Sequence, residues 1–132
     1  GRLKYAQNFI GTNCKTYINF DKMLNEQKPD LVIVCTVDNT HHEFIIKGLK
    51  SGIDVLTEKP LTTDEFKAQS ILNAEKESGK KLIVGFNYRW SPYTTEIKKL
   101  LMKNLNLKPE KNIFFQSLKM VLEKKPLIMI IV

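Results

Sequence analysis

The sequence predicts an α/β fold built on a parallel sheet, and three observations lead to it. Three short apolar runs alternate with helical segments along the chain. The first run, Leu31 to Thr36, has no polar alternation, which is typical of a strand covered on both faces in a parallel sheet. The connections are short, and strand–helix alternation with short connections favours this architecture over an antiparallel one.

The amino-terminal quarter is expected to hold two helices with a short strand between them. Gly11 is placed to end a helix over residues 2–10. Residues 15–18 are predicted to be extended, and Asn19 is predicted to cap a second helix that ends before Pro29. The first helix is expected to bury an apolar face formed by Leu3, Ala6, Phe9 and Ile10.

Two capping boxes predict the next two helix starts. Thr40 pairs with Glu43, so a helix should open at His41, and Thr62 pairs with Glu65 at the start of another. Gly52 and Gly79 are expected to end these helices. The apolar positions are Phe44, Ile45 and Leu49 in the first helix, and Ala68, Ile71 and Leu72 in the second.

The remaining elements are two strands and a last helix. Residues 54–57 and 82–86 are predicted to be strands. Ser91 and Pro92 suit the N-cap and first position of an amphipathic helix. Its buried face is expected to consist of Tyr93, Ile97, Leu100 and Leu101.

Composition excludes several classes of protein. No apolar run approaches the roughly 20 residues that span a bilayer, so a transmembrane protein is not expected. Two cysteines, Cys14 and Cys35, cannot build a disulfide framework, and no Cys/His spacing suggests a metal site. A reduced, cytoplasmic setting is therefore expected.

The net charge of +7 lies almost entirely in the last quarter of the chain. Residues 1–97 carry 13 Lys and Arg against 12 Asp and Glu, whereas residues 98–132 carry 8 Lys against 2 Glu. One alternative interpretation is a binding module whose basic tail docks on nucleic acid or an acidic membrane. No nucleic-acid-binding motif supports it, and we expect neither partner.

Polar residues follow each of the three predicted strands. Asp38 to His41 follow the first strand, Glu58 and Lys59 end the second, and Asn87 and Arg89 follow the third. Parallel strands bring their carboxyl ends to one edge of a sheet, where ligands bind. Helix-start amides favour an anionic group, and Lys59 could contact a hydroxyl or carbonyl oxygen. Taken singly, these groups are more often solvated loop or packing residues, so their convergence carries the argument.

Three segments together resemble the glucose–fructose oxidoreductase / inositol dehydrogenase family. They span residues 36–42, 52–62 and 85–92, and the Glu58-Lys59-Pro60 triplet is the family hallmark. The resemblance implies an oxidoreductase that uses NAD or NADP and acts on a small, sugar-like or cyclitol substrate. It covers roughly residues 1–103 and implies that they form a partial Rossmann-type, doubly wound dinucleotide-binding domain. Residues 104–132 are left as an unassigned basic and apolar tail. A homo-oligomer is compatible with it.

The resemblance also implies roles for individual residues. Lys59 would be catalytic, contacting the nicotinamide and the reacting hydroxyl, and Glu58 would help bind the nicotinamide ribose. The other predicted cofactor-binding residues are Thr36, Asp38 and His41 along the cofactor, and Asn87 and Arg89 at the cleft. The family often has Asn in place of Asp38.

One departure from the family predicts a fragment. No Gly-x-Gly-x-x-Gly turn is present, so the chain is expected to lack the first strand–turn–helix unit, and with it strands 1 and 2 of the order 3-2-1-4-5-6. The strand from Leu31 would then expose an unpaired edge, and dinucleotide binding by the chain alone would be weak or absent. A non-catalytic Rossmann relative, and a tail that is divergent or read out of frame, remain open alternatives.

Overall fold

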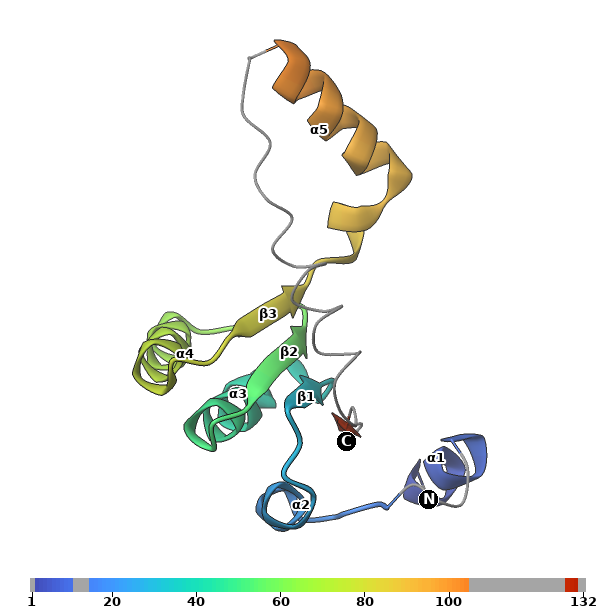
Figure 1. Cartoon of the computed structure of the whole chain (residues 1–132), viewed down its shortest axis with the longest axis vertical. Coiled ribbons are helices and arrows are strands. Elements are labelled where there is room, and N and C mark those ends of the chain that lie inside the picture. Colours follow the sequence, from blue (N-terminus) through green and yellow to red (C-terminus); the bar gives the residue numbers. More distant parts are fainter. Residues whose placement is uncertain (1, 11–14, 105–127, 131–132) are drawn as a thin grey trace.

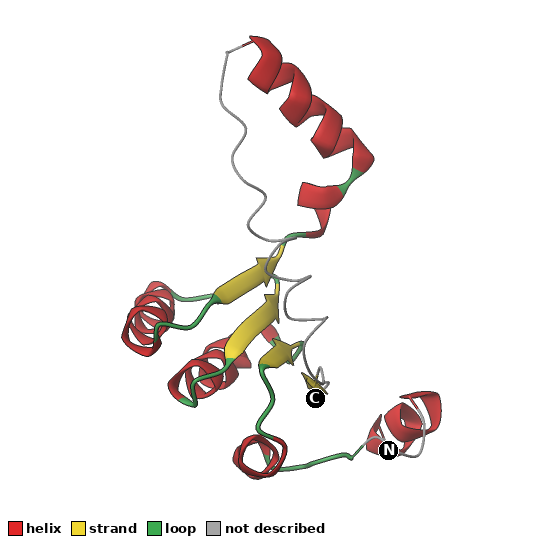
Figure 2. Ribbon diagram, viewed as in Figure 1, coloured by secondary structure: helices red, strands yellow, loops and turns green. Residues whose placement is uncertain are grey.

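A computed structural model describes residues 2–10, 15–104 and 128–130 (Figure 1). Strands and helices alternate along most of the described chain (Figure 2). Their order is α1 (Arg2–Ile10), α2 (Phe20–Gln27), β1 (Leu31–Val34), the 3-10 helix η1 (Asp38–Thr40), α3 (His41–Lys50), β2 (Asp54–Glu58), α4 (Glu65–Ser78), β3 (Leu82–Gly85), the 3-10 helix η2 (Asn87–Trp90), α5 (Pro92–Asn104) and β4 (Ile128–Ile130).

The four strands form one parallel sheet in the order β3-β2-β1-β4. Val32 lies opposite Val55, and Val55 lies opposite Leu82, so the three strands predicted from apolar runs are neighbours. The α/β class and the parallel sheet are therefore confirmed. The strands differ from the predicted ranges by one or two residues at their carboxyl ends.

The core lies between the sheet and helix α3. That helix packs against β1 and β2, and α4 lies beside it (Figure 1). Gly48 lets α3 approach the sheet closely, because a Cβ at this position would lie 2.8 Å from Cγ2 of Val55. The buried apolar side chains include Val32, Val34, Ile45, Leu49, Val55, Ile71 and Ala74.

Helix α2 is attached to α3 by one aromatic and one charged contact. The rings of Phe20 and Phe44 meet edge to face with centroids 5.1 Å apart. Lys47 Nζ lies 2.8 Å from Asp21 Oδ2. Both side chains of this ion pair are about half exposed, so the ring contact is the more important for docking.

The predicted N-caps are correct in two cases and need correction in two. Asn19 Oδ1 accepts a hydrogen bond from Lys22 N, and Ser91 Oγ accepts one from Thr94 N, as expected of N-caps. The N-cap of α4 is Asp64, which accepts from Lys67 N, and not Thr62. Helix α3 does open at His41, but the Thr40 side chain makes no capping bond.

Residues 15–18 form no strand, contrary to the prediction. Ile18 is 95% exposed. A single extended segment gains stability only by pairing with a neighbouring strand, and in the doubly wound order its neighbour would be strand 2, which the described residues do not contain.

The predicted unpaired edge of β1 is also wrong for this structure. Strand β4 pairs with β1 in parallel, with Val32 opposite Ile128 and Val34 opposite Ile130. In the order 3-2-1-4-5-6, strands β1, β2 and β3 take positions 4, 5 and 6, so β4 stands where strand 1 belongs. A segment near the carboxyl end therefore covers the edge.

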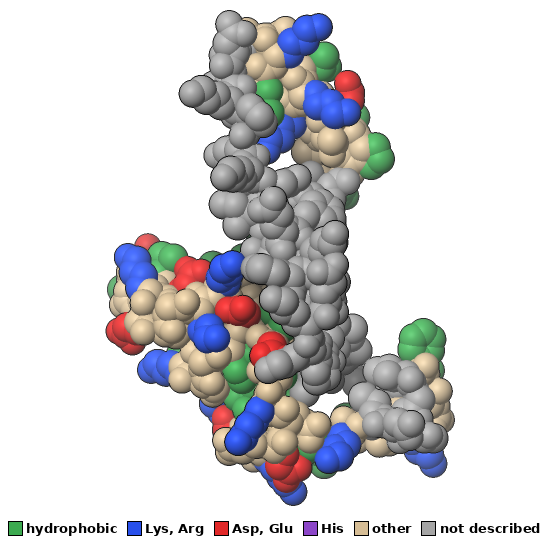
Figure 3. All heavy atoms as spheres, viewed as in Figure 1, with side chains coloured by type: hydrophobic (Ala, Val, Ile, Leu, Met, Phe, Trp, Pro, Cys, Tyr) green, Lys and Arg blue, Asp and Glu red, His purple; other side chains and the backbone are tan. Residues whose placement is uncertain are grey.

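The apolar faces predicted to be buried on α1 and α5 are instead exposed. Phe9 is 82% exposed, and Tyr93 is 76% exposed. Helix α5 extends away from the sheet (Figure 1), and apolar atoms are visible on its surface (Figure 3). The spacing of the apolar residues correctly predicts that both segments are helical. Within the described residues, however, neither helix packs on the sheet. None of the described helices has the length and hydropathy of a membrane span.

Candidate functional site

The three loops that follow β1, β2 and β3 meet at the carboxyl edge of the sheet. The register places Val34 beside Thr57, and Glu58 beside Gly85. Because the strands are parallel, η1, the Glu58-Lys59-Pro60 segment and η2 all leave from this edge. The convergence expected from the sequence is therefore present.

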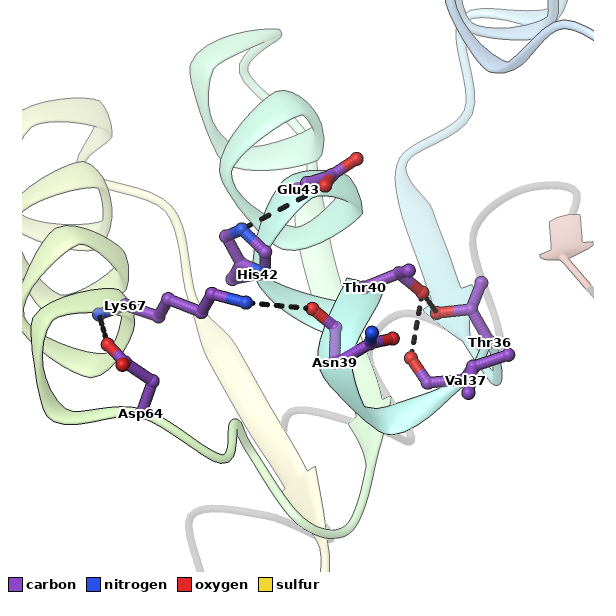
Figure 4. A network of polar contacts seen from close by, with 8 residues as sticks. All are labelled: Thr36, Val37, Asn39, Thr40, His42, Glu43, Asp64 and Lys67. Atoms are coloured by element: carbon purple, nitrogen blue, oxygen red, sulfur yellow. Dashed lines mark hydrogen bonds and ion pairs between the residues drawn. The ribbon is translucent and has the colours of Figure 1, made fainter.

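The loop after β1 turns through η1 into α3. The hydroxyl of Thr40 lies 2.9 Å from the hydroxyl of Thr36 and 2.7 Å from the carbonyl oxygen of Val37 (Figure 4). These contacts explain why Thr40 does not cap α3. Asp38 is exposed at the start of η1, and its carboxylate has no hydrogen-bonding or ionic partner among the described residues.

A second set of contacts joins this loop to α4. Lys67 Nζ donates a hydrogen bond of 3.2 Å to the carbonyl oxygen of Asn39, while the backbone of Lys67 is held by Asp64 (Figure 4). The sequence analysis predicts neither the contact between Lys67 and Asn39 nor the Asp64 cap. The available signal for the cap was Asp64 itself, which directly precedes Glu65 and suits an N-cap as well as Thr62 does.

The segment after β2 presents a carboxylate and an ammonium group side by side in the chain. Glu58 is partly buried, and its Oε2 accepts a hydrogen bond of 3.1 Å from the backbone N–H of Lys59. Lys59 is exposed, and its ammonium group pairs with no other described side chain. The Lys59–Pro60 bond is cis. This pair can offer one cation and one acceptor to a ligand at the edge.

The loop after β3 forms η2, which carries Asn87 and Arg89. Asn87 is exposed, two residues beyond Gly85 at the end of the strand. The side chain of Arg89 lies outside the described residues. The backbone of η2 thus places both positions on the edge shared with Glu58.

His41 is placed differently from the other predicted site residues. Its side chain is only 1% exposed. Nδ1 lies 2.8 Å from the carbonyl oxygen of Pro60, and Nε2 lies 3.0 Å from the carbonyl oxygen of Thr36. Both ring nitrogens are therefore engaged within the chain, and the ring has no hydrogen-bonding atom left for a ligand.

Cys35 lies beneath this edge, next to Glu58. Burial raises the pKa of the Cys35 thiol, and the negative charge of Glu58 raises it further. A protonated thiol is a poor nucleophile, so these surroundings make Cys35 less reactive. Cys14, and any role for it, lies outside the described residues.

The arrangement defines a class of protein: a Rossmann-type domain with an exposed polar edge of the kind that holds dinucleotides. The described residues contain no cluster of three or more metal-binding side chains. Residues 3–86 match the model of the oxidoreductase family with an NAD-binding Rossmann fold. This chain belongs to that family.

Two relatives and one solved structure illustrate the match. YteT of Bacillus subtilis is 45% identical over 83 residues, covering 63% of this chain and 19% of that protein. The inositol 2-dehydrogenase/D-chiro-inositol 3-dehydrogenase of Lactiplantibacillus plantarum is 30% identical over 111 residues, covering 83% of this chain and 31% of that enzyme. The chain thus spans less than a third of the length of either relative.

The solved structure is the WlbA dehydrogenase of Bordetella pertussis in complex with NADH and UDP-GlcNAcA. It superposes with a TM-score of 0.71 at 22% identity, covering 76% of this chain and 29% of that one. At this identity the likeness establishes the fold alone, which is a Rossmann-like oxidoreductase fold.

Proposed function

We propose that this chain forms the nicotinamide side of the dinucleotide-binding domain of an NAD-dependent dehydrogenase acting on a cyclitol, sugar or related hydroxyl compound. The observation that carries the proposal is the Lys59 ammonium, which pairs with no described side chain and lies beside Glu58, at the edge where the loops after β1 and β3 also begin. The names of the relatives agree in chemistry, since one acts on inositol and another was solved with NADH and a UDP-sugar acid.

The donor set fits a nicotinamide nucleoside. When bound, the nicotinamide ring supplies hydride acceptance and donation. Lys59 would contact the reacting oxygen of the substrate and hold negative charge that develops on it. Glu58 would accept hydrogen bonds from ribose hydroxyls, since a carboxylate has several acceptor sites.

The other predicted contacts complete the proposal. Thr36 and Asp38 would line the cofactor from the β1 side, and Asn87 and Arg89 would border the cleft from the β3 side. We propose NAD before NADP only because the family is defined by NAD binding. A cytoplasmic location agrees with Cys35, which is a free thiol, and with a small-molecule substrate. A homo-oligomer of the whole enzyme stays a prediction.

The proposal is tested by titrating the 15N-labelled chain with NADH and NADPH up to millimolar concentration and following amide shifts. Weak binding is expected, because the glycine-rich turn that holds the pyrophosphate is absent from this sequence. The shifted amides should lie in residues 36–42, 58–62 and 85–89.

Two lysine variants make the test specific. Lys59→Met should weaken the shifts, whereas Lys50→Met should leave them unchanged, because Lys50 is exposed at the last turn of α3, away from the carboxyl edge. Shifts that spread over other surfaces, or that survive Lys59→Met, would contradict the proposal. Micromolar affinity of the unmodified chain would overturn the expectation of weak binding.

A further inference from the structure

His41 connects two of the three loops that build the candidate site. Its ring lies between the carbonyl oxygen of Thr36, just beyond β1, and that of Pro60, just beyond β2. The ring is 1% exposed. A buried polar side chain with two partners at hydrogen-bond distance is a well-determined contact and not an accidental one.

The segment around Lys59 has few other contacts that could hold it. Outside the strand ladder, residues 59–63 make no backbone–backbone hydrogen bond among the described residues. The N–H of Lys59 is bonded only to the neighbouring Glu58 side chain, and Pro60 has no N–H to donate. Leu61 packs against the hydrophobic core through its side chain. Among the described residues, the Pro60 carbonyl is the backbone group of this segment that lies at hydrogen-bond distance from a side chain elsewhere in the domain.

The tautomer of the His41 ring decides which of the two carbonyl oxygens receives its N–H. Both partners are carbonyl oxygens, which only accept hydrogen bonds, and a neutral imidazole has a single N–H. The two contacts are similar in length, 2.8 Å for Nδ1 with the Pro60 oxygen and 3.0 Å for Nε2 with the Thr36 oxygen. The Nδ1–H tautomer donates to the segment around Lys59, and the Nε2–H tautomer donates to the loop after β1.

We propose that His41 is a positioning residue: its Nδ1–H holds the Pro60 carbonyl and thereby sets the place of Lys59 relative to the loop after β1. The inference rests on the proposed function for the role of Lys59, although the contact itself does not. His41 then acts on the cofactor site through Lys59, without touching a ligand.

The test is a series of three substitutions, read from the carbonyl 13C resonance of Pro60 in the 13C,15N-labelled full chain. His41→Asn places an amide N–H group near the position of Nδ1, His41→Gln places one near that of Nε2, and His41→Phe keeps the ring without a donor. A carbonyl carbon moves upfield when its oxygen loses a hydrogen bond, so the Pro60 resonance should move upfield in the Phe and Gln variants. The Asn variant should keep the position of the unmodified chain.

His42 supplies the matched control. It is the next residue on α3, its side chain is 19% exposed, and its Nε2 lies 4.0 Å from its own neighbour Glu43 (Figure 4). His42→Phe should leave the Pro60 carbonyl shift unchanged. A difference between the His41→Asn and His41→Gln variants would depend on the position of the donor. Loss of packing alone would not produce it.

Two outcomes would overturn the proposal: equal Pro60 carbonyl shifts in the Asn and Gln variants, or shift changes in the Phe variant that are uniform over α3 and the sheet. The proposed function is judged separately, by the shifts that NADH causes in the same samples. If the Asn variant keeps the Pro60 carbonyl shift but Lys59→Met does not alter NADH binding, the positioning role stands and the cofactor assignment fails.

Discussion

The substitution Gly48→Ala tests how closely helix α3 approaches the sheet. Gly48 is buried in the last turn of α3, and a Cβ there would lie 2.8 Å from Cγ2 of Val55, whose side chain is fully buried on β2. That separation is well inside the usual carbon–carbon contact of about 3.5–4.0 Å. Valine has no flexible end with which to yield.

Two opposing effects set the magnitude. Replacing glycine by alanine inside a helix ordinarily stabilises it by about 0.8–1.0 kcal/mol. Forcing a methyl group into a packed core typically costs about 1–3 kcal/mol. The core cost wins, so Gly48→Ala should lower the free energy of unfolding by roughly 1 kcal/mol.

A double-mutant cycle with Val55→Ala isolates the clash, because this change removes Cγ2. In that background Gly48→Ala should become stabilising by about 1 kcal/mol. Urea denaturation followed by circular dichroism measures all four proteins, and Lys50→Ala, exposed on the same helix, should shift stability by less than about 0.5 kcal/mol. The reasoning is refuted if Gly48→Ala stabilises the native background, or if the change is the same in both backgrounds.

Three further predictions concern α4, β4 and Cys35. Asp64→Ala should cost about 1 kcal/mol of stability in urea denaturation, the usual value for an N-cap, and Thr62→Ala should cost much less. Deleting residues 128–132 should uncover the edge of β1 and promote self-association in sedimentation experiments, and an unchanged monomer would count against the pairing of β4. With the other cysteine replaced by serine, Glu58→Gln should lower the raised pKa of Cys35 and speed its alkylation at pH 8, whereas an unchanged rate would show that burial alone raises it.

Local patterns predicted the strands well because each apolar run is continuous and is followed by polar residues. The same reasoning found the start of α3 at His41, and it found the N-cap of α2, where Asn19 directly precedes the helix. It misassigned the cap of α4 because Thr62 and Asp64 both suit an N-cap, and the choice between them depends on how the chain leaves β2. It also read α5 as having a buried face, although helical spacing indicates only which residues share a face and not what packs on it.

The sequence by itself determined the parallel strand–helix alternation, the polar edge and the family, since these depend on neighbouring residues and on motifs read in order. Only the tertiary structure decided the pairing of β4 with β1 and the position of His41 between Thr36 and Pro60. The physical reason is separation along the chain. A contact between residues 41 and 60, or between 32 and 128, is formed by the packing of the whole sheet, and no local propensity specifies it.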